Sequence, residues 1–83
     1  MTNQIHKYIG NFKNNLYDGD GQLVVGEDIY VGEFKEGMKH GSGKNQGSLD
    51  YDGQWAVNKP EGNGILKVNG QEFMGRFERG KFI

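Results

Sequence analysis

The sequence contains no cysteine and only one proline, Pro60. The lack of thiols excludes a disulfide framework, a thiolate metal site and a cysteine nucleophile, and a single proline excludes a proline-rich linker. The longest uncharged apolar run, residues 23–25, is too short to span a membrane, and the N-terminus lacks the apolar core of a secretory signal. Ten basic and eleven acidic residues leave a formal net charge of −1, so no overall field attracts nucleic acid. We therefore expect a cytoplasmic protein without nucleic-acid partners.

Glycine, in contrast, is abundant, with 15 of the 83 residues against an average of about 7%. The glycines belong to two repeated patterns. An aromatic-x-Gly-x-aromatic pattern starts at Tyr8, Tyr30, Tyr51 and Phe73, at spacings of 22, 21 and 22 residues. A Gly-x-Gly pattern starts 11 residues after each of the first three aromatic residues. Two patterns with one shared period predict a single small domain built of repeats.

Each repeat unit is predicted to be a β-hairpin. The aromatic residue, the glycine and the second aromatic residue fall at i, i+2 and i+4, which places them on one face of a strand. The Gly-x-Gly-x-Leu segment at 19–23 gives the second strand the same spacing. Asn and Gly recur between the strands, and both tolerate the positive φ of a tight turn. The predicted turn residues are Asn15, Gly37, Asn58 and Gly80, with a second set of turns at Gly26, Gly47 and Asn69-Gly70.

The glycines inside the strands need a separate explanation, since glycine weakens a strand interior. Glycines on the face that carries the rings leave room for a Tyr, Phe or Trp ring to lie across the neighbouring backbone. Rings and glycines then form one continuous seam that replaces a two-layer core. Packing in this seam is the first interpretation of the rings, and direct contact with a partner is the second.

The second unit, residues 30–43, resembles the MORN repeat (membrane occupation and recognition nexus). It has the Tyr-x-Gly-x-Phe pattern from Tyr30, the turn glycine Gly37, the His40-Gly41 pair and Gly43. The resemblance implies an all-β fold, a single-layer curved antiparallel sheet of successive hairpins with three and a half units. The units are 8–29, 30–50, 51–72 and the partial 73–83, and residues 1–7 are a lead-in or a short extra strand. It further implies a scaffold for partner proteins, with phospholipid as a second class of partner.

The sequence departs from this family's pattern at two places. Asp18 and Glu61 replace the histidine in the first and third units. The second unit is one residue short, and Asn45 stands where the other units have Leu23 and Leu66. A polar residue on the packed face predicts a weaker hydrophobic seam or a β-bulge in the middle of the array.

No group of residues predicts catalysis. His6, His40 and the few hydroxyl residues do not assemble into a Ser/His/acid set, and His40 is interpreted as a turn residue. The segment from Asp18 is similar to the start of a calcium loop, but Ile29 stands where the twelfth-position glutamate is required. The Gly-x-Gly segments fit neither a dinucleotide-binding nor a Walker phosphate-binding pattern. We therefore expect no enzyme, no cofactor and no metal site.

We expect a non-catalytic protein–protein interaction scaffold or adaptor, cytoplasmic and with cytoskeletal or membrane association as variants. Its partner is a helix or strand of another protein, or a second copy of the chain. The candidate partner-binding face consists of the repeated aromatic residues, which are Tyr8, Phe12, Tyr30, Phe34, Tyr51, Trp55, Phe73 and Phe77.

The alternative function is binding to a phospholipid surface through a small basic strip, formed by Lys35, Lys39, His40 and Lys44. A carbohydrate- or choline-binding hairpin repeat is a further alternative. It has less support, because cages for quaternary ammonium favour Trp and Trp55 is the only one in the chain.

The C-terminal end of the array is predicted to be covered. Residues 18–36 carry six acids and one base, whereas residues 73–83 have a net charge of +2. The array stops halfway through its fourth hairpin, and an unpaired edge strand is a template for pairing. We expect Phe82 and Ile83 to be covered by a second copy, or by a strand or helix of a partner. In a dimer, the acidic region of one copy would meet the basic end of the other.

Overall fold

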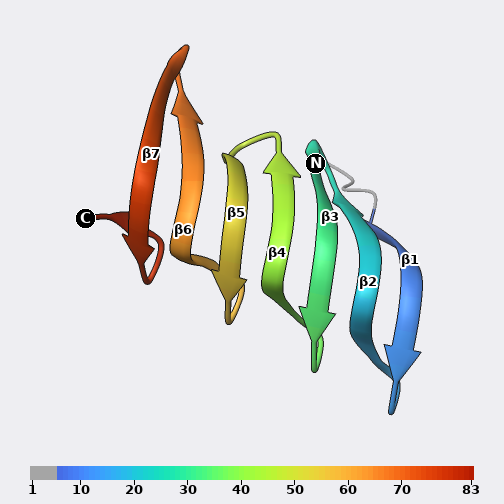
Figure 1. The fold of residues 1–83 in the computed structure, drawn as a ribbon. Coiled ribbons are helices and arrows are strands. Elements are labelled where there is room, and N and C mark those ends of the chain that lie inside the picture. Colours follow the sequence, from blue (N-terminus) through green and yellow to red (C-terminus); the bar gives the residue numbers. More distant parts are fainter. Residues whose placement is uncertain (1–5) are drawn as a thin grey trace.

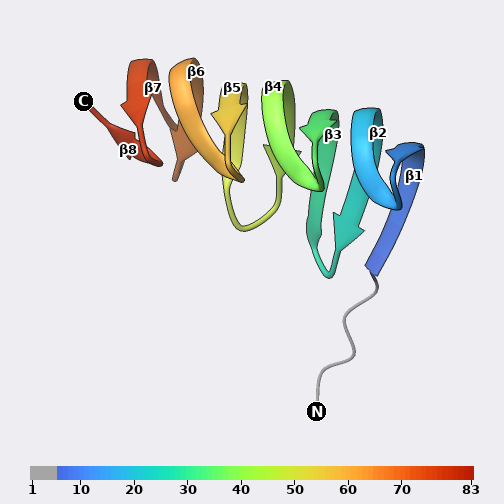
Figure 2. The same cartoon turned by 90° about the horizontal axis from the view of Figure 1, so that it is seen from below.

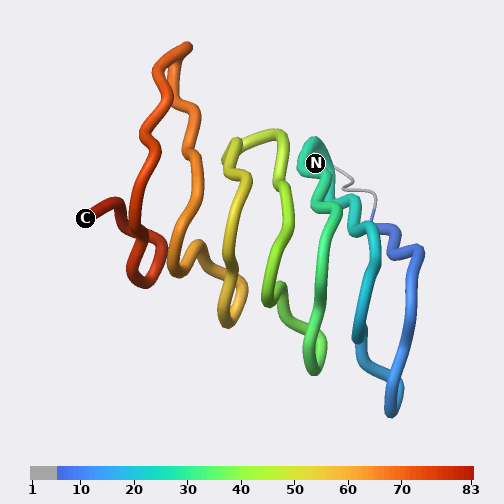
Figure 3. The backbone as a smooth tube through the Cα atoms, viewed as in Figure 1, coloured from blue at the N-terminus to red at the C-terminus, as the bar shows by residue number. Residues whose placement is uncertain are grey.

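The computed structural model describes residues 6–83 and contains eight β-strands in one open antiparallel sheet, in the order of the chain (Figures 1 and 3). The strands are β1 His6–Lys13, β2 Leu16–Val25, β3 Asp28–Lys35, β4 Met38–Gln46, β5 Asp50–Ala56, β6 Lys59–Val68, β7 Gln71–Glu78 and β8 Lys81–Phe82. The prediction of an all-β, single-layer sheet of successive hairpins is confirmed. The predicted lead-in, residues 1–7, lies largely outside the described residues, and its last two residues begin β1.

Two-residue turns connect the strands of each hairpin. The second turn residues, Asn15, Gly37, Asn58 and Gly80, have φ angles of 65°, 83°, 66° and 83°. The residues before them also have positive φ, between 50° and 52°. Two successive left-handed residues are typical of a type I′ turn, whose twist matches that of the flanking strands. The four predicted turn residues are therefore confirmed.

Seven glycines lie opposite one another across β1 to β7. This unbroken row, the glycine ladder, consists of Gly10, Gly21, Gly32, Gly43, Gly53, Gly64 and Gly75. The face of the sheet that carries the repeated aromatic residues is the ring face, and the opposite one is the outer face. On the ring face, the rings of Tyr8, Tyr30 and Tyr51 lie over the ladder glycine of the next strand. A Cβ added to Gly21 would lie 2.5 Å from the Tyr8 hydroxyl oxygen, so the predicted packing of rings over glycines is confirmed.

The tyrosine hydroxyls explain how a single layer encloses these rings. The hydroxyl of Tyr30 donates a 2.9 Å hydrogen bond to the backbone carbonyl of Glu33, and Tyr8 and Tyr51 make the same bond three residues ahead. A strand that brings residue i+3 to the tip of the side chain at i must curl toward the ring face. Figure 2 shows these hooked strands from below. The curled backbone thus takes over part of the covering that a second layer provides in other folds.

The core is a line of rings that runs through the repeat units. Five aromatic residues are at most 4% exposed, namely Tyr30, Phe34, Tyr51, Trp55 and Phe77. Consecutive rings in this line meet edge to face, with centroids 4.9 to 5.2 Å apart. Such pairs contribute about 0.5–1.5 kcal/mol each beyond the burial of their area. The hydrophobic core therefore continues from one unit into the next, as expected for repeats that cannot bury their apolar face alone.

Each of the three complete units contains a β-bulge, but the bulge does not lie at Asn45, where it was predicted. It lies between the ladder glycine and the second aromatic residue of the hairpin. In the second hairpin Gly32 pairs with Gly43 and Phe34 pairs with Lys39, so β4 uses two extra residues there. The same irregularity occurs at the equivalent positions of the first and third hairpins. In the bulge of the second hairpin, Gly41 has a φ of 69°, a left-handed conformation that favours glycine. The prediction of a bulge at Asn45 is wrong, because the register through Asn45 is regular.

Asn45 is instead buried and fully engaged in the core. Its side chain is 4% exposed, and its Nδ2 donates a 2.7 Å hydrogen bond to the backbone carbonyl of Leu49. Leu49 lies in the loop after β4 and packs against the core, as Leu23 and Leu66 do in the other units. The loop therefore supplies the leucine that the strand lacks.

Candidate functional site

The eight rings of the predicted partner-binding face fall into two groups. Five of them form the core described above and are closed to a partner while the sheet is folded. For these five, burial in the core supports the packing interpretation. The other three remain accessible: Phe12 is 60% exposed, and Tyr8 and Phe73 are half-buried.

An aromatic cluster forms the β1 end of the ring face. The rings of Tyr8 and Tyr17 are stacked, with centroids 3.8 Å apart and planes inclined by 11°. Phe12 meets both edge to face, at centroid distances of 5.0 and 5.7 Å. Nε2 of His6 lies 3.2 Å from the Tyr17 hydroxyl. We call Tyr8, Phe12 and Tyr17 the end cluster.

Tyr17 was missed by sequence reasoning because it lies outside both repeated patterns. It does have a sequence signal, since it stands two residues after the turn residue Asn15. The same position in the other units holds Lys39, Pro60 and Phe82, and all four side chains belong to the ring face or its edge. This third repeated position therefore completes the packed face of each unit.

Lys39 is the polar member of that position. Its Nζ lies 5.1 Å from the ring centroids of both Tyr30 and Trp55. Burial lowers the pKa of Lys39 from its ordinary value, and the Asp28 carboxylate opposes this shift. The ammonium group is thus held between two ring faces, where cation–π attraction offsets part of its desolvation.

The basic strip of the lipid-binding alternative is not a single surface. Lys39 lies on the ring face between the rings, whereas Lys44 pairs with Val31 and Asp52 on the outer face. Lys35 and His40 are exposed, at the end of β3 and in the bulge of β4. Because the four residues do not converge, the structure gives this alternative little support.

The residues that replace histidine in the first and third units connect neighbouring hairpins. The Asp18 carboxylate accepts a hydrogen bond from the backbone N–H of Glu36 at 3.4 Å, and Glu61 accepts one from the N–H of Arg79 at 3.0 Å. Both donors lie in the turn of the next unit, where φ is positive. These carboxylates therefore hold adjacent turns together.

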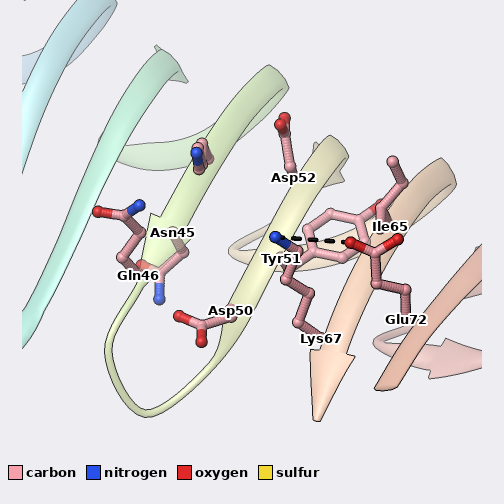
Figure 4. Close-up of a pocket in the computed structure, with 9 residues that line it drawn as sticks. Asn45, Gln46, Asp50, Tyr51, Asp52, Ile65, Lys67 and Glu72 are labelled. Carbon is pink, nitrogen blue, oxygen red and sulfur yellow. Dashed lines mark ion pairs between the residues drawn. The ribbon is translucent and has the colours of Figure 1, made fainter. Parts of the chain in front are cut away.

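A cleft of about 290 Å³ lies beside the β4–β5 loop (Figure 4). Its lining includes Asn45, Tyr51 and the ion pair of Lys67 with Glu72, whose Nζ and Oε2 are 3.5 Å apart. The described residues that line it include carboxylates and lysines, but no Ser, Thr or His.

The C-terminal edge is partly covered by the chain itself. The Phe82 ring lies over Gly75, with Cε1 3.0 Å from the position of an added Cβ, and its centroid is 5.3 Å from that of Phe77. The Ile83 N–H donates a 2.9 Å hydrogen bond to the carbonyl of Arg76. Phe82 therefore performs in the fourth unit the covering role that tyrosine performs in the others. It is still 46% exposed, and covering of this edge by a partner stays a prediction.

The sequence pattern of the MORN repeat matches residues 8–24, 30–44 and 51–71. Each stretch begins at the first aromatic residue of a hairpin and contains its strand glycines. No curated protein matches the chain. Within residues 6–83, no helix is long and apolar enough to cross a membrane.

Proposed function

Since the chain belongs to the MORN-repeat family, we propose that it is a non-catalytic protein-interaction module that binds a helix or strand of another protein at its end cluster. MORN repeats are a non-enzymatic repeat type and often occur in proteins that bind other proteins or membranes. Our proposal is that the partner is a protein and that it binds at the end cluster.

The exposure of Phe12 carries this proposal. Phe12 is 60% exposed, although it occupies the same position in its unit as the buried Phe34. Together with Tyr8 and Tyr17 it forms an accessible apolar surface on a chain whose mean hydropathy is −0.80. Clustered exposed aromatic residues are typical of interaction surfaces, where they provide much of the binding energy.

The position of the cluster adds a second contact. Within residues 6–83, β1 pairs only with β2, so its other edge presents backbone N–H and C=O groups that no described strand pairs with. A partner strand could pair with this edge while an apolar side chain rests on Phe12, and a helix could lie over the rings directly.

Affinity purification of the tagged chain, followed by mass spectrometry, tests the proposal with one variant and one control. Phe12→Asp should lose the recovered partners, because it places a charge in the centre of the cluster. Val68→Asp alters an equally apolar exposed residue at the far end of β6 and should keep them. If Phe12→Asp still recovers the same partners, the proposal is overturned. If both variants float with anionic vesicles, the result favours the phospholipid alternative.

A further inference from the structure

The outer face carries two rows of side chains, one on each side of the glycine ladder. The first outer row runs through Ile9, Gln22, Val31, Lys44, Asp52, Ile65 and Met74. The second outer row runs through Asp20, Glu33, Ser42, Gln54, Asn63 and Arg76. The backbone of the ladder lies between the two rows, and the surface is hollowed there twice, once beside Val31 and once beside Met74.

Two apolar members of the first outer row are exposed. Val31 is 53% exposed and Met74 is 70% exposed, and neither contributes to the core. Both stand next to a hollow whose floor is glycine backbone. A side chain from another molecule would therefore find both a neighbour and space at these two places.

When the strand order of these rows is reversed, three pairs of positions meet with complementary chemistry. We propose that two copies of the chain pack outer face against outer face, about a two-fold axis parallel to the strands and between β4 and β5. Such an axis keeps each row opposite the same row and reverses the strand order, so β4 faces the partner's β5. This surface is separate from the end cluster, so the inference goes beyond the proposed function.

This arrangement produces two contacts between opposite charges and one contact between apolar side chains. Lys44 faces the partner's Asp52, and Val31 faces the partner's Ile65. Asp20 on β2 faces the partner's Arg76 on β7. Each contact occurs twice, as a two-fold interface requires.

Charge also favours this orientation over the other one. A two-fold axis perpendicular to the strands would keep the strand order and place β2 and β3 of both copies against each other. The outer-face acids Asp20 and Glu33 would then lie against the strands that carry the same two acids in the other copy. Like charges brought together at an interface are unfavourable. The reversed order instead places Asp20 opposite Arg76 of the other copy.

The outer face is one of the two broad faces of the molecule, which measures 35 × 31 × 16 Å. A stable interface buries about 800 Å² on each partner, so a stable dimer would have to engage most of this face. Two twisted sheets pack face to face with their strands about 30° apart, an arrangement that a strand-parallel axis allows.

Charge reversal of the Asp20–Arg76 contact tests the proposal, with sedimentation velocity as the measurement. The wild type should form a dimer, and Asp20→Arg or Arg76→Asp alone should weaken dimerisation at least tenfold. An equimolar mixture of the two variants should restore it, because both contacts of the mixed dimer then join opposite charges. Four strands separate the two residues within one chain, so an effect inside the monomer does not explain this rescue.

Two controls locate the contact. Glu27→Arg makes the same change of charge at the tip of the β2–β3 hairpin and should leave the dimer intact. Val31→Asp should produce a folded monomer, since Val31 is outside the core. A wild type that stays monomeric at high micromolar concentration overturns the proposal. A dimer that resists these reversals but is lost with Phe82→Asp and Ile83→Lys overturns it too, in favour of the C-terminal edge.

Discussion

The Nζ of Lys39 donates a 3.4 Å hydrogen bond to Oδ1 of Asn45, which joins the two polar residues of an otherwise apolar seam. Both occur in the second unit. The first unit has Tyr17 and Leu23 at the same two positions, and the third has Pro60 and Leu66. The ammonium requires an acceptor within the seam, and the amide is that acceptor. The two replacements are thus one coordinated change.

This pairing predicts strong coupling between the two positions. Asn45→Leu alone should destabilise the fold by about 1–3 kcal/mol, since it leaves the Leu49 carbonyl and the Lys39 ammonium without their partner. Lys39→Tyr with Asn45→Leu copies the first unit and should recover much of that loss. Urea unfolding of the wild type, both single variants and the double variant gives the coupling energy, expected at about 0.5–3 kcal/mol. Strictly additive effects would show that the pair does not act as a unit.

The hairpins, turns and ring-over-glycine packing were predictable because they depend on residues at short, repeated spacings. Which rings stay exposed could not be predicted, because the exposure of each ring depends on the strands beside it. Phe12 and Phe34 occupy one position of the repeat, and both contact the rings of Tyr8 and Tyr17. For Phe34 these rings come from the preceding hairpin and add to the Tyr30 ring of its own hairpin, whereas no hairpin precedes Phe12 among the described residues. Phe12 lies on the edge strand and stays exposed. A lysine held between two rings has no signature in a single sequence, so the sequence pattern places Lys39 in the exposed basic strip.

The glycine ladder predicts that a side chain at Gly32 is far more disruptive than a change at its neighbour. A Cβ at Gly32 would lie 2.6 Å from the Ser42 carbonyl oxygen and 2.7 Å from the Tyr30 hydroxyl. Gly32→Val should therefore cost at least the 1–3 kcal/mol or so of ordinary overpacking. Val31→Thr, on the exposed outer face, is the matched control and should stay within about 0.5 kcal/mol. Equal urea midpoints for the two variants would refute the close approach of ring and glycine.

The turn at Val57 predicts a stabilising substitution. Val57 has a φ of 50°, a left-handed conformation that a β-branched residue rarely adopts. Asn14 occupies the same turn position in the first unit, with a φ of 52°. Val57→Asn should raise the free energy of unfolding by about 0.4–1 kcal/mol, because asparagine tolerates the left-handed conformation that strains valine.

Thermal unfolding measures this gain, and Val31→Asn is the control because it makes the same chemical change in an extended strand. An equal or lower melting temperature for Val57→Asn than for the wild type would contradict the assigned strain. Asn58 behaves differently: its Oδ1 accepts a 2.9 Å hydrogen bond from the Lys39 N–H. Asn58→Gly keeps the φ but loses this bond, so it should be mildly destabilising.

Alkaline pH should destabilise the sheet through its buried tyrosines. Burial raises the pKa of Tyr30 and of Tyr51 above the ordinary value of 10.0. Between that value and the raised pKa, the unfolded chain loses a proton that the folded chain keeps. The stability linked to each hydroxyl is therefore fully present below about pH 10 and falls above it, by up to about 1.4 kcal/mol per pH unit.

Lys39 acts in the opposite direction, because its pKa is lowered and its contribution to stability rises as pH approaches 10.5. Two tyrosines outweigh one lysine, so the urea midpoint of the wild type should fall steeply above pH 10. Tyr30→Phe removes one of the two tyrosine contributions. It should be about 1 kcal/mol less stable at pH 8, where it lacks the hydrogen bond to the Glu33 carbonyl. The difference should shrink or reverse by pH 11, and parallel midpoint curves for the two proteins from pH 8 to 11 would refute the role of the Tyr30 hydroxyl.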